Sequence, residues 1–134
     1  MPFVIDNSVV CGWFLANQAT PYTEAIAQRL LDDTAIAPAL WPLELANVLR
    51  TACKRGTLVA QRAQEISAEI CDLPITIDTE PQLPAALLAL ALRFDLTSYD
   101  AAYLELALRL QLPIATQDAA LMQAAVAAGV GVAR

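Results

Sequence analysis

The stretch Phe3-Val4-Ile5-Asp6-Asn7-Ser8 decides the fold. Three apolar residues lead into a carboxylate, and polar residues that can begin a helix follow it. An apolar run that is followed by helical periodicity is typical of a strand buried in a parallel sheet. Ligands of open α/β sheets bind beyond the carboxyl ends of such strands, so Asp6 stands where a site is expected.

The rest of the chain alternates between helical and strand-like segments. Further short strands are expected at 35–38, 74–77 and 112–116, with a fifth at the sheet edge at 130–133. Helices are expected at 7–15, 20–33, 41–55, 58–72, 79–93, 98–110 and 118–128. Asn7 or Ser8 is expected to cap the first of these helices, and Thr57 the fourth. This order predicts an α/β fold, a three-layer α/β/α sandwich with four to five short parallel strands, in a single domain over residues 1–134.

The composition limits the class of protein. Hydrophobic residues make up 57% of the chain and charged residues only 16%, which favours buried helices and a subunit interface. We expect a homodimer, with Trp13, Phe14 and Trp41 available for the contact. No apolar run approaches the ~18–20 residues of a membrane span, and the N-terminus lacks the features of a signal peptide, so a cytoplasmic location without membrane contact is expected.

Charge and residue usage restrict the chemistry. The net charge of −6 gives no basic footprint for nucleic acid, although a metal-dependent nuclease would still need an acidic site. The chain has no histidine, the commonest acid–base group, so hydrolysis would need a nucleophile from a metal-bound water. Cys11, Cys53 and Cys71 have no metal-type spacing and are expected to pack as small hydrophobic residues.

Four acidic residues stand at strand ends or helix starts on the expected carboxyl edge of the sheet: Asp6, Glu44, Asp100 and Asp118. Apolar neighbours flank each of them, and a carboxylate in such surroundings is costly unless it is paired or bound to a metal. Two like charges about 4 Å apart repel by about 4 kcal/mol at an effective dielectric of 20. A divalent cation would relieve this repulsion, and an all-oxygen donor set favours Mg²⁺ or Mn²⁺.

Each of these carboxylates also has a simpler explanation as part of a helix start. Asp6 and Asp118 are suited to N-caps, Asp100 to a capping box with Thr97, and Glu44 to the first turn of a helix. Taken singly, each is better explained in this way. Their common position at one edge of the sheet favours a shared metal site.

Four stretches resemble, in order and spacing, the successive motifs of PIN-domain ribonucleases, and most closely those of VapC toxins of type II toxin–antitoxin systems. They are VIDNS at 4–8, PLELANVL at 42–49, LTSYDAAYL at 96–104 and IATQDAAL at 114–121. The resemblance covers essentially the whole chain. It implies a magnesium-dependent endoribonuclease that hydrolyses RNA phosphodiester bonds with a metal-activated water.

The resemblance also implies roles for individual residues and partners. The catalytic and metal-binding acids of the family match Asp6, Glu44, Asp100 and Asp118. Ser8 and Thr116 match its supporting polar residues, and Asn47, one turn after Glu44, is expected to help position the site. The implied partners are an RNA substrate, a small antitoxin protein that inserts into the site and blocks it, and a second copy of the chain.

The acidic charge of the chain has one local exception. Arg50 and Lys54 share a face of the helix that carries Glu44, and could contact RNA phosphates. They could equally be a solvated helix end that complements the helix dipole.

Three other functions share parts of this pattern. A receiver-like signalling module needs paired acids after the first strand and a late lysine, but Asn7 follows Asp6 and the only lysine is Lys54. A haloacid-dehalogenase-type phosphatase needs Asp-x-Asp, where this chain has Asp6-Asn7-Ser8. A PIN-like scaffold that binds without cleaving remains open.

Overall fold

A four-stranded parallel sheet forms the centre of the computed structural model, which describes all residues 1–134. The strands are β1 (Phe3–Ile5), β2 (Ala35–Ala37), β3 (Ile75–Ile77) and β4 (Ile114–Ala115), and their order in the sheet is β3-β2-β1-β4. Because the chain builds outward from β1 to β3 and then returns to the other side of β1, the topology reverses next to β1. This places the end of β1 at the switch point of the sheet, where α/β folds bind ligands.

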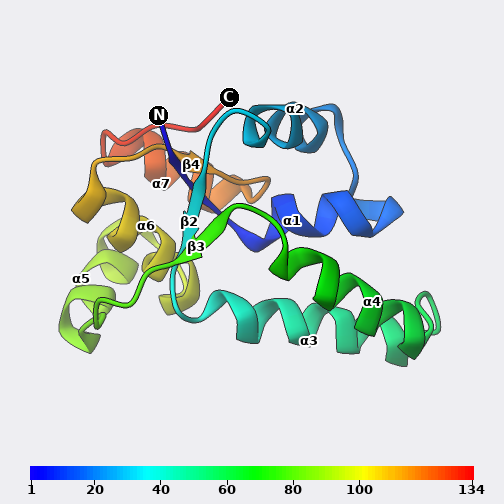
Figure 1. The fold of residues 1–134 in the computed structure, drawn as a ribbon. Coiled ribbons are helices and arrows are strands. Elements are labelled where there is room, and N and C mark those ends of the chain that lie inside the picture. The colour runs from blue at the N-terminus through cyan, green and yellow to red at the C-terminus, as the bar shows by residue number, and fades with distance from the viewer.

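Helices cover both faces of the sheet (Figure 1). They are α1 (Asn7–Phe14), α2 (Pro21–Leu30), α3 (Trp41–Lys54), α4 (Ala60–Cys71), α5 (Pro84–Phe94), α6 (Ser98–Leu110) and α7 (Ala119–Ala127), with a short 3₁₀ helix, η1 (Ala16–Gln18), after α1. The predicted α/β/α sandwich with four to five parallel strands is therefore confirmed.

The alternation of side chains along β1 divides the core into two parts. Phe3 and Ile5 point to one face and join the apolar side chains of α1 to α4, whereas Val4 points to the other and joins those of α6 and α7. All three residues of β1 are fully buried. A strand buried on both faces must be apolar throughout, which is the pattern that identified it in the sequence.

Two local predictions about helix caps were wrong, and the expected fifth strand is only partly formed. Asp6, rather than Asn7 or Ser8, caps α1 by accepting a hydrogen bond from the Asn7 amide. Thr57 does not cap α4; its hydroxyl donates to the Ala52 carbonyl at the end of α3, and α4 begins only at Ala60. The expected fifth strand is reduced to a single parallel bridge between Ile114 and Val132.

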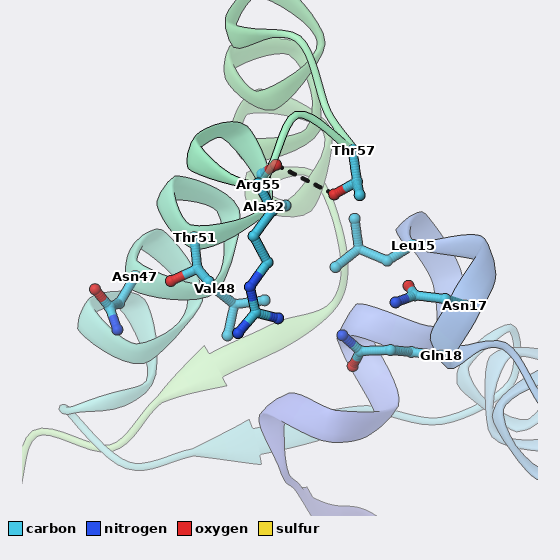
Figure 2. Close-up of a pocket in the computed structure, with 9 residues that line it drawn as sticks. All are labelled: Leu15, Asn17, Gln18, Asn47, Val48, Thr51, Ala52, Arg55 and Thr57. Carbon is cyan, nitrogen blue, oxygen red and sulfur yellow. Dashed lines mark hydrogen bonds between the residues drawn. The ribbon is translucent and has the colours of Figure 1, made fainter.

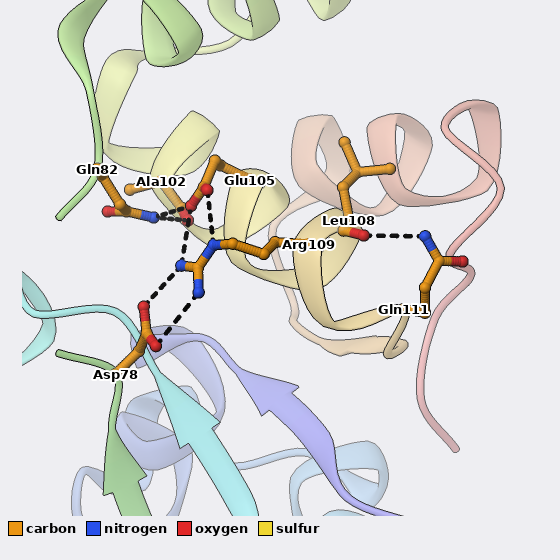
Figure 3. Close-up of polar contacts among 7 residues, drawn as sticks. All are labelled: Asp78, Gln82, Ala102, Glu105, Leu108, Arg109 and Gln111. Atoms are coloured by element: carbon orange, nitrogen blue, oxygen red, sulfur yellow. Dashed lines mark hydrogen bonds and ion pairs between the residues drawn. The ribbon is translucent and has the colours of Figure 1, made fainter. Parts of the chain in front are cut away.

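An ion network holds α6 against the end of β3 (Figure 3). The Arg109 guanidinium donates to Asp78 Oδ2 at 2.6 Å and to Glu105 Oε1 at 2.9 Å. The Gln82 amide donates to Glu105 Oε2 at 2.6 Å and to the Ala102 carbonyl at 2.8 Å. Since α6 carries Asp100 at its start, this network helps to fix the position of that carboxylate.

Apolar side chains remain exposed on one helix in particular. No residue of α5 is buried, and Leu88 and Leu92 are 59% and 75% exposed. Trp41, by contrast, is buried in the core, so it is not available for the interface expected from the sequence. No helix has the length and apolarity needed to cross a bilayer.

Candidate metal centre

Asp6 lies at the end of β1, where the backbone turns into α1. Its own amide donates to the Ala115 carbonyl at 2.9 Å, so the last sheet bond holds it beside the end of β4. The residue is only 6% exposed, and its Oδ1 accepts the Asn7 amide at 2.8 Å. Burial raises the pKa of Asp6 above its ordinary value, and the charge of Asp118 adds to this, while hydrogen bonds from Thr116, Ser8 and Asn7 oppose the rise.

Two hydroxyl groups fix the other oxygen of Asp6. Oδ2 accepts hydrogen bonds from Thr116 Oγ1 at 2.7 Å and from Ser8 Oγ at 2.8 Å. Ser8 and Thr116, both expected as supporting residues, are thus in direct contact with the carboxylate. The Thr116 hydroxyl also accepts the Asp118 amide at 3.0 Å, which links Asp6 to the loop that carries the last acidic residue.

Gln117 ties the same loop to α1 and η1. Its amide group donates to the carbonyls of Ser8 and Gln18, each at 3.0 Å, while its side-chain oxygen accepts the Thr20 hydroxyl at 2.7 Å. Its backbone amide donates to Ser8 Oγ at 2.8 Å. Sequence reasoning missed this role, because no local pattern shows that Gln117 lies against residues about 100 positions earlier.

Glu44 reaches the site from the first turn of α3. It is half-buried, and its Oε1 accepts the hydroxyl of the fully buried Tyr103 at 2.7 Å. Burial and the charge of Asp6 raise the pKa of Glu44, whereas the Tyr103 hydrogen bond opposes the rise. Tyr103 is a second residue whose role the sequence did not reveal; its place one turn after Asp100 on α6 was the available signal.

Asp100 lies in the first turn of α6, but it is not the cap of that helix. Thr97 is the N-cap, and its hydroxyl accepts the Asp100 amide at 3.1 Å. Burial raises the pKa of Asp100 to about 6, and the charges of Asp118, Asp6 and Glu44 contribute in that order. The helix therefore has its cap without the charge of Asp100, which remains directed to the other three acids.

Asp118 is both a helix cap and a member of the acidic group. It is the N-cap of α7, and Oδ2 accepts the Leu121 amide at 2.8 Å. Contrary to the expected apolar surroundings, Asp118 is exposed, as are the two alanines that follow it. The start of α7 faces solvent, so Asp118 is accessible, whereas Asp6 is buried.

The four carboxylates form one electrostatic group without a counter-charge. The charges of Asp118, Asp6 and Glu44 all raise the pKa of Asp100, and none of the four carboxylates takes part in any of the six salt bridges of the chain. No three acidic or cysteine side chains have the spacing to hold a metal ion by direct ligation alone. Mg²⁺ is commonly bound through one or two carboxylates with water completing its shell, so this oxygen-rich, uncompensated group fits such an ion.

The other predicted site residues of α3 are Asn47, Arg50 and Lys54, and a polar pocket lies beside this helix. Asn47 lines a polar pocket between η1 and α3, together with Arg55 (Figure 2). Arg50 and Lys54 are exposed, form no salt bridge and do not line this pocket. Their contact with RNA phosphates stays a prediction.

The three cysteines differ from one another in their surroundings. Cys11 is buried, and burial together with the charges of Asp6 and Glu44 raises its pKa to about 12, which makes the thiol inert. Cys53 is partly buried. Cys71 is exposed, so its expected packing as a small hydrophobic residue was wrong.

Comparisons with known proteins identify the family of the chain. The chain is 31% identical, over 90% of its length and 89% of theirs, to proteins called ribonuclease VapC12 from two strains of Mycobacterium tuberculosis. Its fold is similar to that in the crystal structure of PAE2754 from Pyrobaculum aerophilum, with a TM-score of 0.73 over 92% of this chain and 84% of that one, at 18% identity. The model of the family described as PIN domain matches residues 3–127. The chain therefore belongs to the PIN-domain family and is a VapC-like member of it.

Proposed function

We propose that this protein is a metal-dependent endoribonuclease and acts as the toxin of a type II toxin–antitoxin pair. The observation that carries the proposal is the uncompensated group of four carboxylates at the switch point of the sheet. Family membership supports it, since the VapC12 relatives are named ribonucleases. A receiver-like module is less well supported, because Asn7 occupies the place of its second acid.

In this proposal the carboxylates hold Mg²⁺ or Mn²⁺, with Asp6 and Asp100 as the principal ligands and Glu44 and Asp118 completing the set. When bound, the ion would polarise the scissile phosphodiester and make a water molecule more acidic. Ser8 and Thr116 hold Oδ2 of Asp6 in place, and Tyr103 does the same for Glu44. These hydrogen bonds preorganise the carboxylates, so that little rearrangement is needed when the ion and the RNA bind.

The proposal extends to the assembly of the protein. We propose a homodimer that buries the exposed leucines of α5, in place of the aromatic contact expected from the sequence. A small antitoxin would block the acidic site, and both proteins would act in the cytoplasm. Light scattering of the purified chain checks the dimer; a monomer mass at high concentration would contradict it.

The central experiment is RNA cleavage by the purified chain with Mg²⁺ or Mn²⁺ and with excess EDTA. Cleavage is expected only with the metal, and Asp6→Asn is expected to abolish it. Asp32→Asn is the matched control, since Asp32 is an exposed acid without a salt bridge, distant in sequence from all four carboxylates. Cleavage that persists in EDTA would overturn the metal dependence, and no cleavage under any condition would leave the scaffold function.

A further inference from the structure

A polar pocket of about 290 Å³ lies between η1 and the outer half of α3. Six of its nine lining residues are polar: Asn17, Gln18, Asn47, Thr51, Arg55 and Thr57. Figure 2 shows the amides of Asn17 and Gln18 facing Arg55 and α3 across this space. The pocket is at the lower end of the size range of ligand sites, which suits one nucleobase or one phosphate rather than a folded segment.

Arg55 gives the pocket a free positive charge. Three of the eight basic side chains, Arg29, Arg62 and Arg109, are engaged in salt bridges, and Arg55 is not. Its side chain runs back along α3, so that the guanidinium lies near Val48 and Gln18 (Figure 2). No carboxylate lines the pocket, although the chain has a net charge of −6. A guanidinium in such a place can bind phosphate bidentately.

The pocket lies further along the helix that carries Glu44. Glu44, Thr51 and Arg55 lie on one face of the helix within about 40°, and Arg55 is about 16 Å from Glu44 along the axis. Asn47 lies between them, one turn from Glu44. Arg50 and Lys54 are turned about 80–120° away from this face, which explains why they do not line the pocket.

The opposite wall is also connected to the site. The Gln18 carbonyl accepts the Gln117 amide, and the same amide donates to the Ser8 carbonyl, two residues from Asp6. One hydrogen-bonded side chain therefore joins η1, the end of β4 and the start of α1. Both walls of the pocket are thus fixed relative to the four carboxylates.

We propose that this pocket binds a nucleotide that flanks the scissile bond of a single-stranded RNA. Arg55 binds a backbone phosphate, while the amides of Asn17, Gln18 and Asn47 hydrogen-bond to the edge of an unpaired base. The inference rests on the proposed ribonuclease function and adds to it a substrate-binding subsite. It makes Arg55 the main electrostatic contact to RNA on a protein whose overall charge repels it.

The test measures cleavage and binding of a short, labelled single-stranded RNA of random sequence. Arg55→Ala is expected to raise KM about tenfold with a much smaller change in kcat, and to lower the salt slope of binding by about 0.7. Arg55→Lys should restore part of the affinity, because it keeps the charge but loses the bidentate geometry. Binding is measured in an Asp100→Asn background, where the RNA stays intact.

Further variants separate this role from a structural one. Arg93→Ala removes the same charge from α5, on the other side of the molecule (Figure 1), and is expected to leave KM and the salt slope unchanged. Asn47→Ala and Gln18→Ala should alter which bases flank the cleavage sites. The melting temperature of Arg55→Ala should equal that of the wild type, since Arg55 forms no ion pair.

The outcomes are distinguishable from those of the parent proposal. If the wild type neither cleaves nor binds RNA, the ribonuclease function itself is wrong. If the wild type cleaves RNA and Arg55→Ala has the same KM and salt slope as Arg93→Ala, the subsite is wrong and the pocket is left to a protein partner.

Discussion

Two acidic groups lie at the carboxyl edge of the same sheet, and only one of them has a basic side chain as a partner. After β3, Asp78 shares the Arg109 guanidinium with Glu105, so two carboxylates are paired with one well-bonded cation (Figure 3). After β1, Asp6 lies among three further carboxylates and has no basic partner. The acids after β3 thus have a basic partner, and the four around Asp6 have none.

The difference indicates which group would be stabilised by a bound cation. Burial, and after it the like charges nearby, raise the pKa of Asp6, Glu44 and Asp100, and so cost stability at neutral pH. Hydroxyl groups and one tyrosine orient these carboxylates but do not neutralise them. Orientation without neutralisation is what a divalent cation requires of its site.

Removing a charge from the uncompensated group should have the largest effect. Asp100→Asn keeps the shape of the side chain, and Thr97 still caps α6. RNA cleavage in Mg²⁺ should fall by at least about a hundredfold, while the metal-free protein should be as stable as the wild type or more so. Thr97→Ala is the control, because it removes the cap and keeps the charge; it should cost about 1 kcal/mol of stability with cleavage retained. Wild-type cleavage by Asp100→Asn would contradict the role of this residue.

Removing the cation from the compensated group should act on stability instead. Arg109→Gln leaves Asp78 and Glu105 facing each other, and should lower the free energy of unfolding by about 1–3 kcal/mol in urea denaturation. The matched variant is Arg62→Gln, whose partners Glu65 and Glu69 are about half exposed. Its loss should stay below about 0.5 kcal/mol. Equal losses would show that the network at β3 is no more than a surface contact.

Loosening one oriented carboxylate should have a moderate effect on catalysis. Tyr103→Phe removes the hydrogen bond to Glu44, and should lower kcat about tenfold with little change in KM. Because this bond lowers the pKa of Glu44, its loss should also move the acidic limb of the pH–rate profile to higher pH. Tyr99→Phe, on the exposed side of the same helix, should leave both unchanged. An unshifted profile would restrict Tyr103 to a packing role.

The smallest expected effect is the pH dependence of the metal-free protein. The pKa of Asp100 is about 6 in the folded chain and near 3.8 in the unfolded one, so the folded state binds more protons between these values. Stability should therefore rise as the pH falls from 7 to 5, by a few degrees of melting temperature. Asp100→Asn should flatten this rise, and saturating Mg²⁺ should diminish it. A melting temperature that falls over the same interval would contradict the repulsion.

The sequence was sufficient to predict the fold and the acidic group because both depend on local patterns. The apolar run Phe3–Ile5 predicts a strand, and the spacing of apolar residues in α3 and α6 predicts helices. Parallel strands then bring their carboxyl ends to one edge of the sheet. The hydrogen-bond partners of the site residues could not be predicted, because they lie far away in the sequence. Tyr103 meets Glu44 across 59 positions, and Gln117 meets Gln18 across 99.

Burial and loop conformation were the other sources of error. Trp41 has the same local pattern whether it faces a core or a partner, and only the packing of β3 and α4 decides between them. Likewise, η1 has no periodicity of its own, so the polar pocket that it forms with α3 could not be predicted.

The hydrogen bond between Thr116 and Asp6 joins residues 110 positions apart, and Asp118 lies further still along the chain. A ribosome adds about 5–20 residues per second, so the first strand waits roughly 6–22 s for this partner. A nascent chain therefore carries an unfinished site for nearly the whole of its synthesis. The order of elements along the chain itself delays activity until translation is almost complete.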